Sequence, residues 1–348
     1  MTTIKISAVG DILMWRPQIQ SGKISENEYS FDYMFNEVKP LLKESDIVMG
    51  NLETNLAGRE LNYQFINPKT RWPVFNCPDE LSQALKNSGF NVLTTANNHC
   101  LDKGIDGMKR TLDILDKVGF NHTGTFHSLD DSKKKLIMDV KGIRVGILSY
   151  TYGTNLNPIP KDEPWAVNLI NNDMLGDIYK MKKRVDLTIV CIHFGREFSR
   201  HPNEEQKNWV QQCFEYGADI VLGAHPHVIQ PMKIKYVKDI DGIEKERFVI
   251  YSLGNFISDI MLNNIHTVSG VILNLSITKS PQGNTSITHI EYIPTWVYRN
   301  KTASGTKFIV LPIGKYLQSK DSALPSNALS KMNIVWNNTS SHLGGITR

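Results

Sequence analysis

The stretch from Val185 to Val228 reads VDLTIVCIHFGREFSRHPNEEQKNWVQQCFEYGADIVLGAHPHV, and the predicted fold depends on it. It contains two apolar runs, Leu187–Ile192 and Ile220–Leu222, separated by a segment with a helical pattern. Both runs have the length and the β-branched content of buried strands. The histidines that follow the runs directly are His193, His225 and His227. Sites in open α/β sheets form at the carboxyl ends of parallel strands, so we expect these imidazoles to meet at one edge.

Polar side chains follow other β-like runs along the chain in the same way. The predicted strands are Ile4–Val9, Ser45–Met49, Phe90–Thr95, Ile143–Tyr150 and Phe248–Leu253. The polar residues shortly after four of these runs are Asp11, Glu53, Asn98, His99 and Asn255. Apolar residues at helical spacing over Phe31–Leu41 and Met108–Val118 predict helices between the strands. The sequence therefore predicts an α/β fold whose polar groups share one edge.

The periodicity changes toward the C-terminus. Two strand-like runs, Val268–Thr278 and Thr285–Trp296, are separated by the turn-forming segment SPQGN, which predicts an antiparallel hairpin. The end of the chain is polar and rich in serine and asparagine. We therefore predict one domain over residues 1–317 and a polar C-terminal tail over residues 318–348, which wraps the surface or is loosely ordered.

The composition excludes several classes of protein. Hydrophobic residues make up 41% of the chain and charged residues 21%, as in ordinary globular proteins. A net charge of +4 without a clustered basic face gives no support for a nucleic-acid partner. No run approaches the roughly 20 apolar residues of a membrane span, and the N-terminus lacks the pattern of a signal peptide. The four cysteines show no CxxC spacing and no disulfide framework, so a cytoplasmic location is favoured.

The donor types at the predicted edge favour a hydrolytic metal centre. Carboxylates, an amide oxygen and imidazoles suit zinc, manganese or iron better than thiolate-preferring ions. A pair of ions about 3.5–4 Å apart needs a bridging carboxylate, and Glu53 is the candidate. Such ions lower the pKa of a bound water and stabilise charge on the attacking and leaving oxygens. We therefore expect one or two divalent transition-metal ions.

Each motif taken singly also has a simpler explanation. Gly10-Asp11 is a common way for a strand to enter a turn, and Asn97–His99 is typical of a turn whose side chains satisfy backbone groups. His193 alone is typical of a hydrogen-bonded, half-buried histidine. His225 and His227 are a stronger signal, because side chains two residues apart share one face of an extended backbone. The joint placement of the motifs favours the metal site.

Four ordered motifs carry a resemblance to a known family. They are Asn97-Asn98-His99-x-x-Asp102-x-Gly104, His193-x-Gly195-x-Glu197, Gly223-Ala224-His225-Pro226-His227-Val228-x-Gln230 and Ser252-Leu253-Gly254-Asn255-Phe256. The resemblance also includes Gly10-Asp11, Asn51-Leu52-Glu53 and Ile293-Pro294-Thr295-Trp296, so it covers residues 4 to 300. In this order the motifs resemble the CapA family, the bacterial capsule or poly-γ-glutamate synthesis proteins. The ordered series is highly specific.

The resemblance implies a fold and a set of site residues. The fold is related to calcineurin-like metallophosphoesterases, with a β-sandwich flanked by helices in four αββα layers and a metal site at the strand ends. The positions that match metal ligands are Asp11, Glu53, Asn98, His193, His225 and His227. His99 matches the imidazole that stabilises charge on the substrate, and Asp102 of the same motif is the second predicted catalytic residue. Arg196, Arg200 and Asn255 are candidate substrate-binding residues, although solvated loop positions also explain the two arginines.

The chain departs from the metallophosphoesterase pattern at one ligand position. That pattern has a histidine two residues after the first aspartate, and this chain has Leu13 there. One metal position therefore loses a nitrogen ligand, and Glu197 is the candidate that compensates. The chain also shows no membrane anchor of the kind common in capsule-assembly members.

Two functions follow from the sequence. The first is a metal-dependent hydrolase-like enzyme of poly-γ-glutamate, capsule or cell-envelope metabolism. Its substrate is an anionic polymer, or an anionic small-molecule precursor with amide or phosphoryl groups. The second is a non-catalytic accessory subunit of a polymer-synthesising complex. The retained ligand set favours the first function, and Leu13 favours the second.

Overall fold

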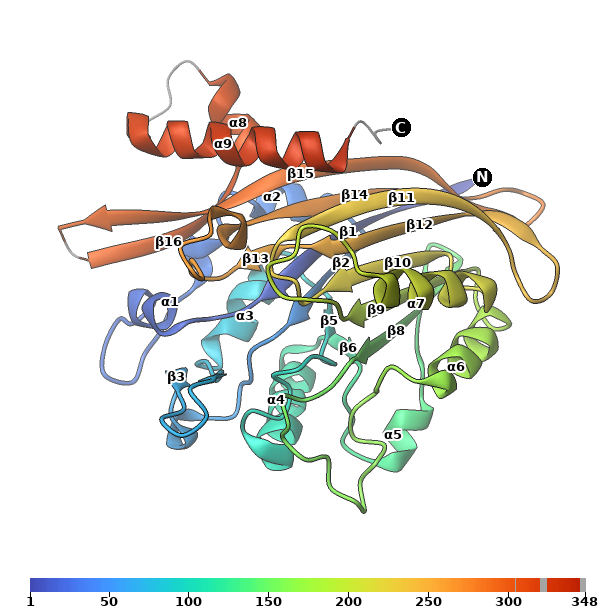
Figure 1. Ribbon diagram of the computed structural model, residues 1–348, viewed down its shortest axis with the longest axis horizontal. Coiled ribbons are helices and arrows are strands. Elements are labelled where there is room, and N and C mark those ends of the chain that lie inside the picture. The colour runs from blue at the N-terminus through green and yellow to red at the C-terminus, as the bar shows by residue number, and fades with distance from the viewer. Residues whose placement is uncertain (304, 320–323, 345–348) are drawn as a thin grey trace.

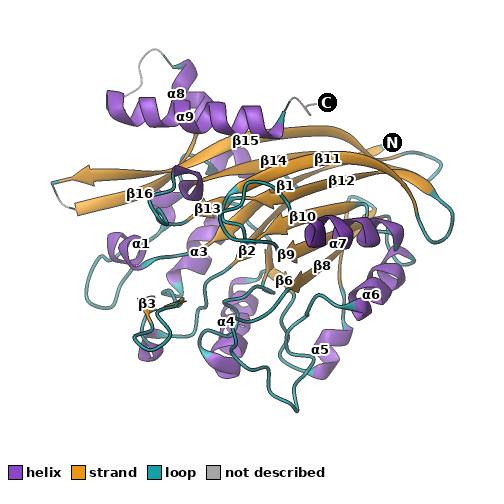
Figure 2. Ribbon diagram, viewed as in Figure 1, coloured by secondary structure: helices purple, strands orange, loops and turns teal. Residues whose placement is uncertain are grey.

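The computed structural model describes residues 1–303, 305–319 and 324–344 of the chain. Two β-sheets pack face to face, and helices cover the outer face of each sheet (Figures 1 and 2). The predicted α/β class and the predicted order of helix, sheet, sheet and helix are therefore confirmed.

The larger sheet combines parallel and antiparallel strands. Its order is β16 (Gly305–Pro312), β15 (Thr285–Thr302), β14 (Ser269–Lys279), β1 (Thr2–Ile12), β2 (Ile47–Leu52), β5 (Val92–Thr94) and β6 (Asn121–Thr123), and β13 (Asn255–Ile257) pairs with β1. Strands β1, β2, β5 and β6 run parallel, so their carboxyl ends lie at one edge. Strands β14 and β15 form the predicted antiparallel hairpin.

The smaller sheet is mainly parallel. Its order is β11 (Ile229–Lys238), β12 (Glu244–Leu253), β10 (Ile220–Ala224), β9 (Leu187–His193), β8 (Ile143–Thr151) and β7 (Leu136–Val140). Strands β12, β10, β9 and β8 run parallel. Strand β11 pairs antiparallel with β12, which the sequence reading missed. The predicted histidines therefore follow two neighbouring strands, β9 and β10.

The chain crosses from one sheet to the other at Gly254, directly after β12. The next residue starts β13, and Asn255 pairs with Asp11 of β1. The backbone at this crossing is very close to β1, because a side chain at Gly10 would place its Cβ 1.8 Å from the carbonyl oxygen of Gly254. Gly254 itself has a φ of 71°, in the left-handed region that favours glycine. The two glycines thus bring the polar ends of both sheets together.

The side-chain alternation of the strands explains the layers. In β1, Ile4, Ile6 and Ala8 face the smaller sheet and join the core between the sheets. Val9 and Ile12 of the same strand join the core beneath the helices. Each fully buried aliphatic side chain contributes about 1.5–3 kcal/mol of transfer free energy, so both faces of the sheet stabilise the fold.

Helices pack on both outer faces. The helices α3 (Glu80–Asn87) and α4 (Gly104–Val118) cover the larger sheet, and α6 (Asn172–Lys182) and α7 (Glu204–Glu215) cover the smaller one. Asn171 and Asn203 cap α6 and α7 through their side chains, and these bonds satisfy amides that a helix start leaves without partners. The other elements are α1 (Arg16–Ser21), η1 (Asp32–Met34), α2 (Lys39–Leu42), η2 (Arg59–Leu61), β3 (Phe65–Ile66), β4 (Pro73–Val74), α5 (Leu129–Lys133) and η3 (Ile265–Val268).

The predicted polar tail contains regular structure. Helix α8 (Ile313–Gln318) leads into it, and helix α9 (Ser326–Leu343) lies along β15 (Figure 1). Within α9, Ala328, Met332 and Val335 recur at helical spacing and are buried in the core of the larger sheet. This sparse apolar stripe is enough to fix the helix, although the segment is polar overall. Residues 320–323 and 345–348 of the tail lie outside the described residues.

The single helix expected over Phe31–Leu41 is wrong. A 3-10 turn over Asp32–Met34 is followed by a separate helix that begins at Lys39. Pro40 lacks a backbone N–H and has a fixed φ, so it fits the first turn of a new helix but not the interior of an existing one.

No helix in the described parts of the chain is long and apolar enough to cross a membrane.

Candidate metal centre

Polar strand ends from both sheets converge on one buried point. Asp11 comes from the end of β1 and Glu53 follows β2, both in the larger sheet. His193 ends β9, and His225 and His227 follow β10 in the smaller sheet. All five side chains are at least nine-tenths buried. The structure therefore brings together residues that are separated by up to 216 positions in the chain.

The carboxylate of Glu53 lies at the centre of this group and is fully buried. Neither of its oxygens has a hydrogen-bond partner among the described residues. Burial, followed by the negative charges of Asp11 and Glu197, raises the pKa of Glu53 well above its ordinary value. A buried carboxylate without a partner is costly, and a bound cation is the direct remedy. The observation fits a metal site.

Two overlapping sets of donors surround Glu53. One set is Asp11, Glu53 and His193, and the other is Glu53, His225 and His227. Within each set, one donor atom of every residue lies within 4.8 Å of the others. Glu53 belongs to both, which is the position that a carboxylate bridging two ions must occupy.

The ring of His193 is oriented by Asn51, a residue that the sequence reading did not single out as functional. The amide Nδ2 of Asn51 lies 3.2 Å from His193 Nδ1 and donates to Asp11 Oδ1 at 2.8 Å. His193 Nε2 therefore faces the centre, 2.7 Å from Asn98 Oδ1 and 3.3 Å from Glu53 Oε1. Three donor atoms of different chemical types converge here. The only sequence signal for Asn51 is its place two residues before Glu53 in the motif.

The pKa values of two of the buried imidazoles are strongly shifted. Burial, together with the neighbouring histidines, lowers the pKa of His193 and of His225 well below the ordinary value. Both rings are therefore neutral, the form that binds metals. His225 Nδ1 is buried and has no partner among the described residues, like the Glu53 oxygens.

Hydrogen-bond partners at Nδ1, the nitrogen that points away from Glu53, hold the ring of His227 in place. Its Nδ1 lies 3.1 Å from Asp11 Oδ2 and 3.0 Å from Asn255 Oδ1, and its Nε2 lies 3.8 Å from Glu53 Oε1. Burial acts to lower the pKa of His227, but the hydrogen bond to Asp11 and the surrounding carboxylates outweigh it and raise the pKa. Asn255 is fully buried and positions this ring, rather than facing the open cavity as a substrate ligand would.

The His225-Pro226-His227 segment is not extended, contrary to the expectation from its spacing. The backbone φ is 96° at His225 and 57° at His227. Left-handed backbone at non-glycine residues costs of the order of 1–3 kcal/mol and persists only where the surroundings enforce it. The two ring centroids lie 6.0 Å apart and both rings still face Glu53. Such strain is typical of a functional site.

His99 lies at the mouth of the site, with a different set of contacts. Its Nδ1 lies 2.8 Å from Asp102 Oδ2, which also accepts the backbone N–H of Phe75 at 2.7 Å. The ring packs edge-on against Phe75 with centroids 4.7 Å apart. The carboxylate and the aromatic ring together fix the imidazole, so Asp102 acts on the site through His99.

Two residues that sequence reasoning missed also lie here. Tyr152, directly after β8, has its ring 4.7 Å from the ring of His225. Burial and the charges of Glu197 and Glu53 raise its pKa to about 12, so it remains a neutral phenol. Asn155 lies in the loop after β8, and its amide lies 3.4 Å from His99 Nδ1. The signal in the sequence that could have indicated Tyr152 is its position directly after a predicted parallel strand.

The remaining predicted residues lie at different distances from the centre. Leu13 is buried on the wall and offers no ligand atom. Glu197 is exposed and lines the cavity without joining either donor set. Arg196 is exposed. Arg200 donates to the backbone oxygen of Asn338 in α9 at 2.8 Å, so it braces the last helix.

A cavity of about 610 Å³ opens directly over the imidazoles. Its walls are mostly apolar, and no Lys or Arg occurs among the described residues that line it. The largest wall residues are Trp15, Trp72, Phe75, Tyr152, Phe198 and Ile260. The cavity therefore offers mainly apolar contact to the part of a substrate that lies next to the metal centre.

Removal of Glu53 should cost more metal than removal of Glu197. Glu53 belongs to both donor sets and is fully buried, whereas Glu197 is exposed at the rim. We expect Glu53→Ala to lose most of the bound metal and Glu197→Ala to keep most of it. Elemental analysis of the two purified variants measures this directly. The opposite order would make Glu197 the main carboxylate and remove Glu53 from the bridge.

The fold, a β-sandwich flanked by helices, is shared with a solved nucleotidase structure. The NAD nucleotidase NadN of Haemophilus influenzae superposes with a TM-score of 0.50 at 14% identity, over 98% of this chain and 67% of that chain. The likeness shows the architecture alone.

The chain belongs to the family described as bacterial capsule synthesis protein PGA_cap, which matches residues 5–260. It is 32% identical over 262 residues to the capsule biosynthesis protein CapA of Bacillus anthracis, covering 74% of this chain and 60% of the relative. It is also 32% identical over 258 residues to the PGA biosynthesis protein CapA of Bacillus subtilis, with 74% and 63% coverage. The match thus spans somewhat less than two thirds of each curated relative.

Proposed function

We propose that the chain is a metal-dependent hydrolase that acts on an anionic amide or phosphoryl substrate in poly-γ-glutamate, capsule or cell-envelope metabolism. The observation that carries the proposal is the Glu53 carboxylate, which is fully buried, has no hydrogen-bond partner among the described residues and is surrounded by histidine nitrogens. The family membership supports the biological setting.

The residues that would hold divalent ions are Asp11, Glu53, Asn98, His193, His225 and His227. Zinc, manganese or iron fits this mixture of carboxylate, amide and imidazole donors. When bound, such an ion would activate a water molecule and polarise the bond under attack. Asn51 and Asn255 orient His193 and His227 for this task through hydrogen bonds to their outer nitrogens.

In the proposed reaction, His99 donates the proton that the leaving group takes up. Asp102 holds the Nδ1 side of the imidazole, which leaves Nε2 as the atom available to the leaving group. Tyr152 is a neutral donor on the same side of the cavity.

Leu13 supports the alternative function, an accessory subunit of a polymer-synthesising complex. A leucine on the wall supplies no ligand where the hydrolytic pattern has a histidine. In this alternative the donor sets are kept for binding or for structural stability.

Turnover of a defined substrate distinguishes the two functions. We expect metal-loaded protein to cleave a member of a screen of γ-glutamyl amides, muropeptide fragments and phosphodiesters, and we expect a chelator to abolish the cleavage. The Glu53→Ala variant is the matched negative. A metal-loaded protein that is inert across the whole screen would favour the accessory subunit.

A further inference from the structure

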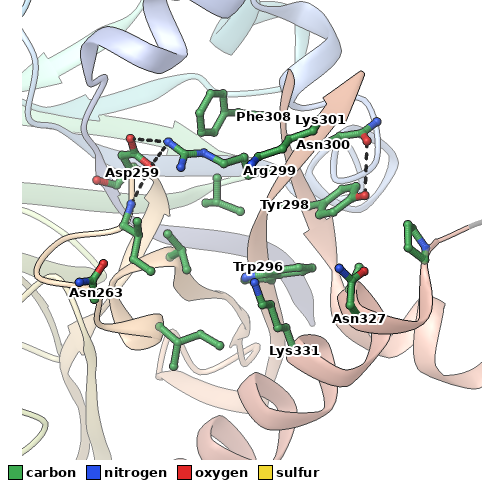
Figure 3. Close-up of a pocket in the computed structure, with 17 residues that line it drawn as sticks. Asp259, Asn263, Trp296, Tyr298, Arg299, Asn300, Lys301, Phe308, Asn327 and Lys331 are labelled. Carbon is green, nitrogen blue, oxygen red and sulfur yellow. Dashed lines mark hydrogen bonds and ion pairs between the residues drawn. The ribbon is translucent and has the colours of Figure 1, made fainter. Parts of the chain in front are cut away.

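A second and larger cavity lies beside the metal cavity. It has a volume of about 710 Å³ and is enclosed by β15, β16, the start of α9 and the loop of residues 258–268 (Figure 3). The lining residues that matter here are Trp296, Tyr298, Arg299, Lys301, Phe308 and Lys331. Neither the proposed reaction nor the predicted ligand set uses any of them.

The inner surface of this cavity is aromatic. Trp296 and Tyr298 lie next to each other on β15 with ring centroids 5.4 Å apart, and Phe308 of β16 extends the surface. Figure 3 shows Trp296 in the middle of the lining, with Lys331 and Asn327 of α9 beside it. Such a surface offers contact area to the apolar backbone of a chain-like ligand.

The charge of this cavity is positive. Arg299 is neutralised, because its guanidinium makes an ion pair with Asp259 at 3.0 Å. Lys301 and Lys331 are exposed, and neither ammonium forms an ion pair among the described residues. Two lysine cations that have no ion-pair partner among the described residues therefore lie at an aromatic surface. The metal cavity, by contrast, has no Lys or Arg among its described lining residues.

The two cavities share a wall. Ile260 lines both of them. Trp15, from the metal cavity, donates its indole N–H to the hydroxyl of Ser258 in the second cavity at 3.1 Å. A ligand that extends from the metal centre across Ile260 therefore reaches the lysines without leaving the protein surface.

Hydrogen bonds connect the wall between the two cavities to the metal centre. Asn255, which positions His227, donates its amide to the backbone oxygen of Thr267 at 2.7 Å. The hydroxyl of Thr267 accepts the backbone N–H of Met261 at 2.9 Å, and the Asp259–Arg299 ion pair ties the loop to β15. The distance between the two cavities is therefore set by the fold.

We propose that the second cavity is a binding subsite for a polymer that carries a carboxylate in every unit, a γ-linked glutamate chain. The reacting unit lies in the metal cavity, and the units that follow cross Ile260 and place their carboxylates at Lys301 and Lys331. The proposal rests on the proposed function for the identity of the polymer. The position of the subsite is inferred from the two lysine cations and from the wall that the cavities share.

Binding of γ-glutamyl oligomers tests the subsite without the need for turnover. A γ-glutamyl dimer and a long γ-glutamyl oligomer are titrated against the full chain by calorimetry. We expect the long oligomer to bind the wild type more tightly than the dimer. The Lys301→Ala/Lys331→Ala variant should bind the long oligomer about tenfold more weakly, since two partly solvated charge contacts contribute of this order. Binding of the dimer should not change.

The matched control is Lys117→Ala/Lys238→Ala, which removes two exposed lysines that line neither cavity. It should bind both oligomers like the wild type, and a melting curve for each variant checks folding. The subsite is overturned if the wild type shows no preference for length, or if Lys301→Ala/Lys331→Ala keeps that preference. If the protein binds the long oligomer more tightly than the dimer but hydrolyses neither, the proposed function is wrong and the subsite is still supported.

Discussion

The His225→Ala/His227→Ala variant is expected to contain no stoichiometric metal. The two imidazoles and Glu53 form one of the two donor sets, and removal of both imidazoles leaves Glu53 alone in that set. Elemental analysis of variant and wild type, purified together without a chelating tag, gives the answer. The loss should be close to complete, because only one imidazole, that of His193, then remains of the three around the shared Glu53.

The control for this variant removes two histidines elsewhere. His122 and His127 both pair with Asp116, away from either donor set. His122→Ala/His127→Ala should keep the full metal content. Full metal in His225→Ala/His227→Ala would show that the site is misassigned.

The His99→Gln variant is expected to keep its metal and lose turnover. Its imidazole is held by Asp102 and Phe75 at the cavity mouth and belongs to neither donor set. A positioned acid contributes typically 10²–10⁴-fold, so the rate per metal-loaded molecule should fall by about two orders of magnitude or more. Steady-state turnover normalised to metal content is the measurement.

A melting curve separates catalysis from structure in the same experiment. If His99 only braces the loop through Asp102, His99→Gln would melt at a lower temperature and retain its normalised rate. His122→Gln serves as the matched control, because His122 makes a comparable contact to Asp116 at 3.0 Å. It should change neither metal content nor rate.

The sequence predicted the parallel core because its signals are local. Apolar runs such as Leu187–Ile192 and Ile220–Leu222 became β9 and β10 with ends shifted by one or two residues. Parallel neighbours end at the same edge of a sheet, so the sequence alone places the polar residues after these strands together. The fold class and the grouping of the donors follow from this single rule.

Contacts that depend on distant segments could not be predicted. Asn51 orients both Asp11 and His193 only because β1, β2 and β9 end at the same point. Arg200 was predicted to bind the substrate. Its side chain instead donates a hydrogen bond to α9, which lies more than a hundred residues later in the chain. That helix was itself missed, because its apolar residues stand among the many serines and asparagines of the segment.

The metal content of the wild-type chain tests the central claim most directly. The claim is that Glu53 and the surrounding histidines form a metal centre. Elemental analysis of protein purified without a chelating tag should show one or two zinc, manganese or iron ions per chain. A chain that is free of these metals as purified, and that takes up none when titrated with each, would contradict the account.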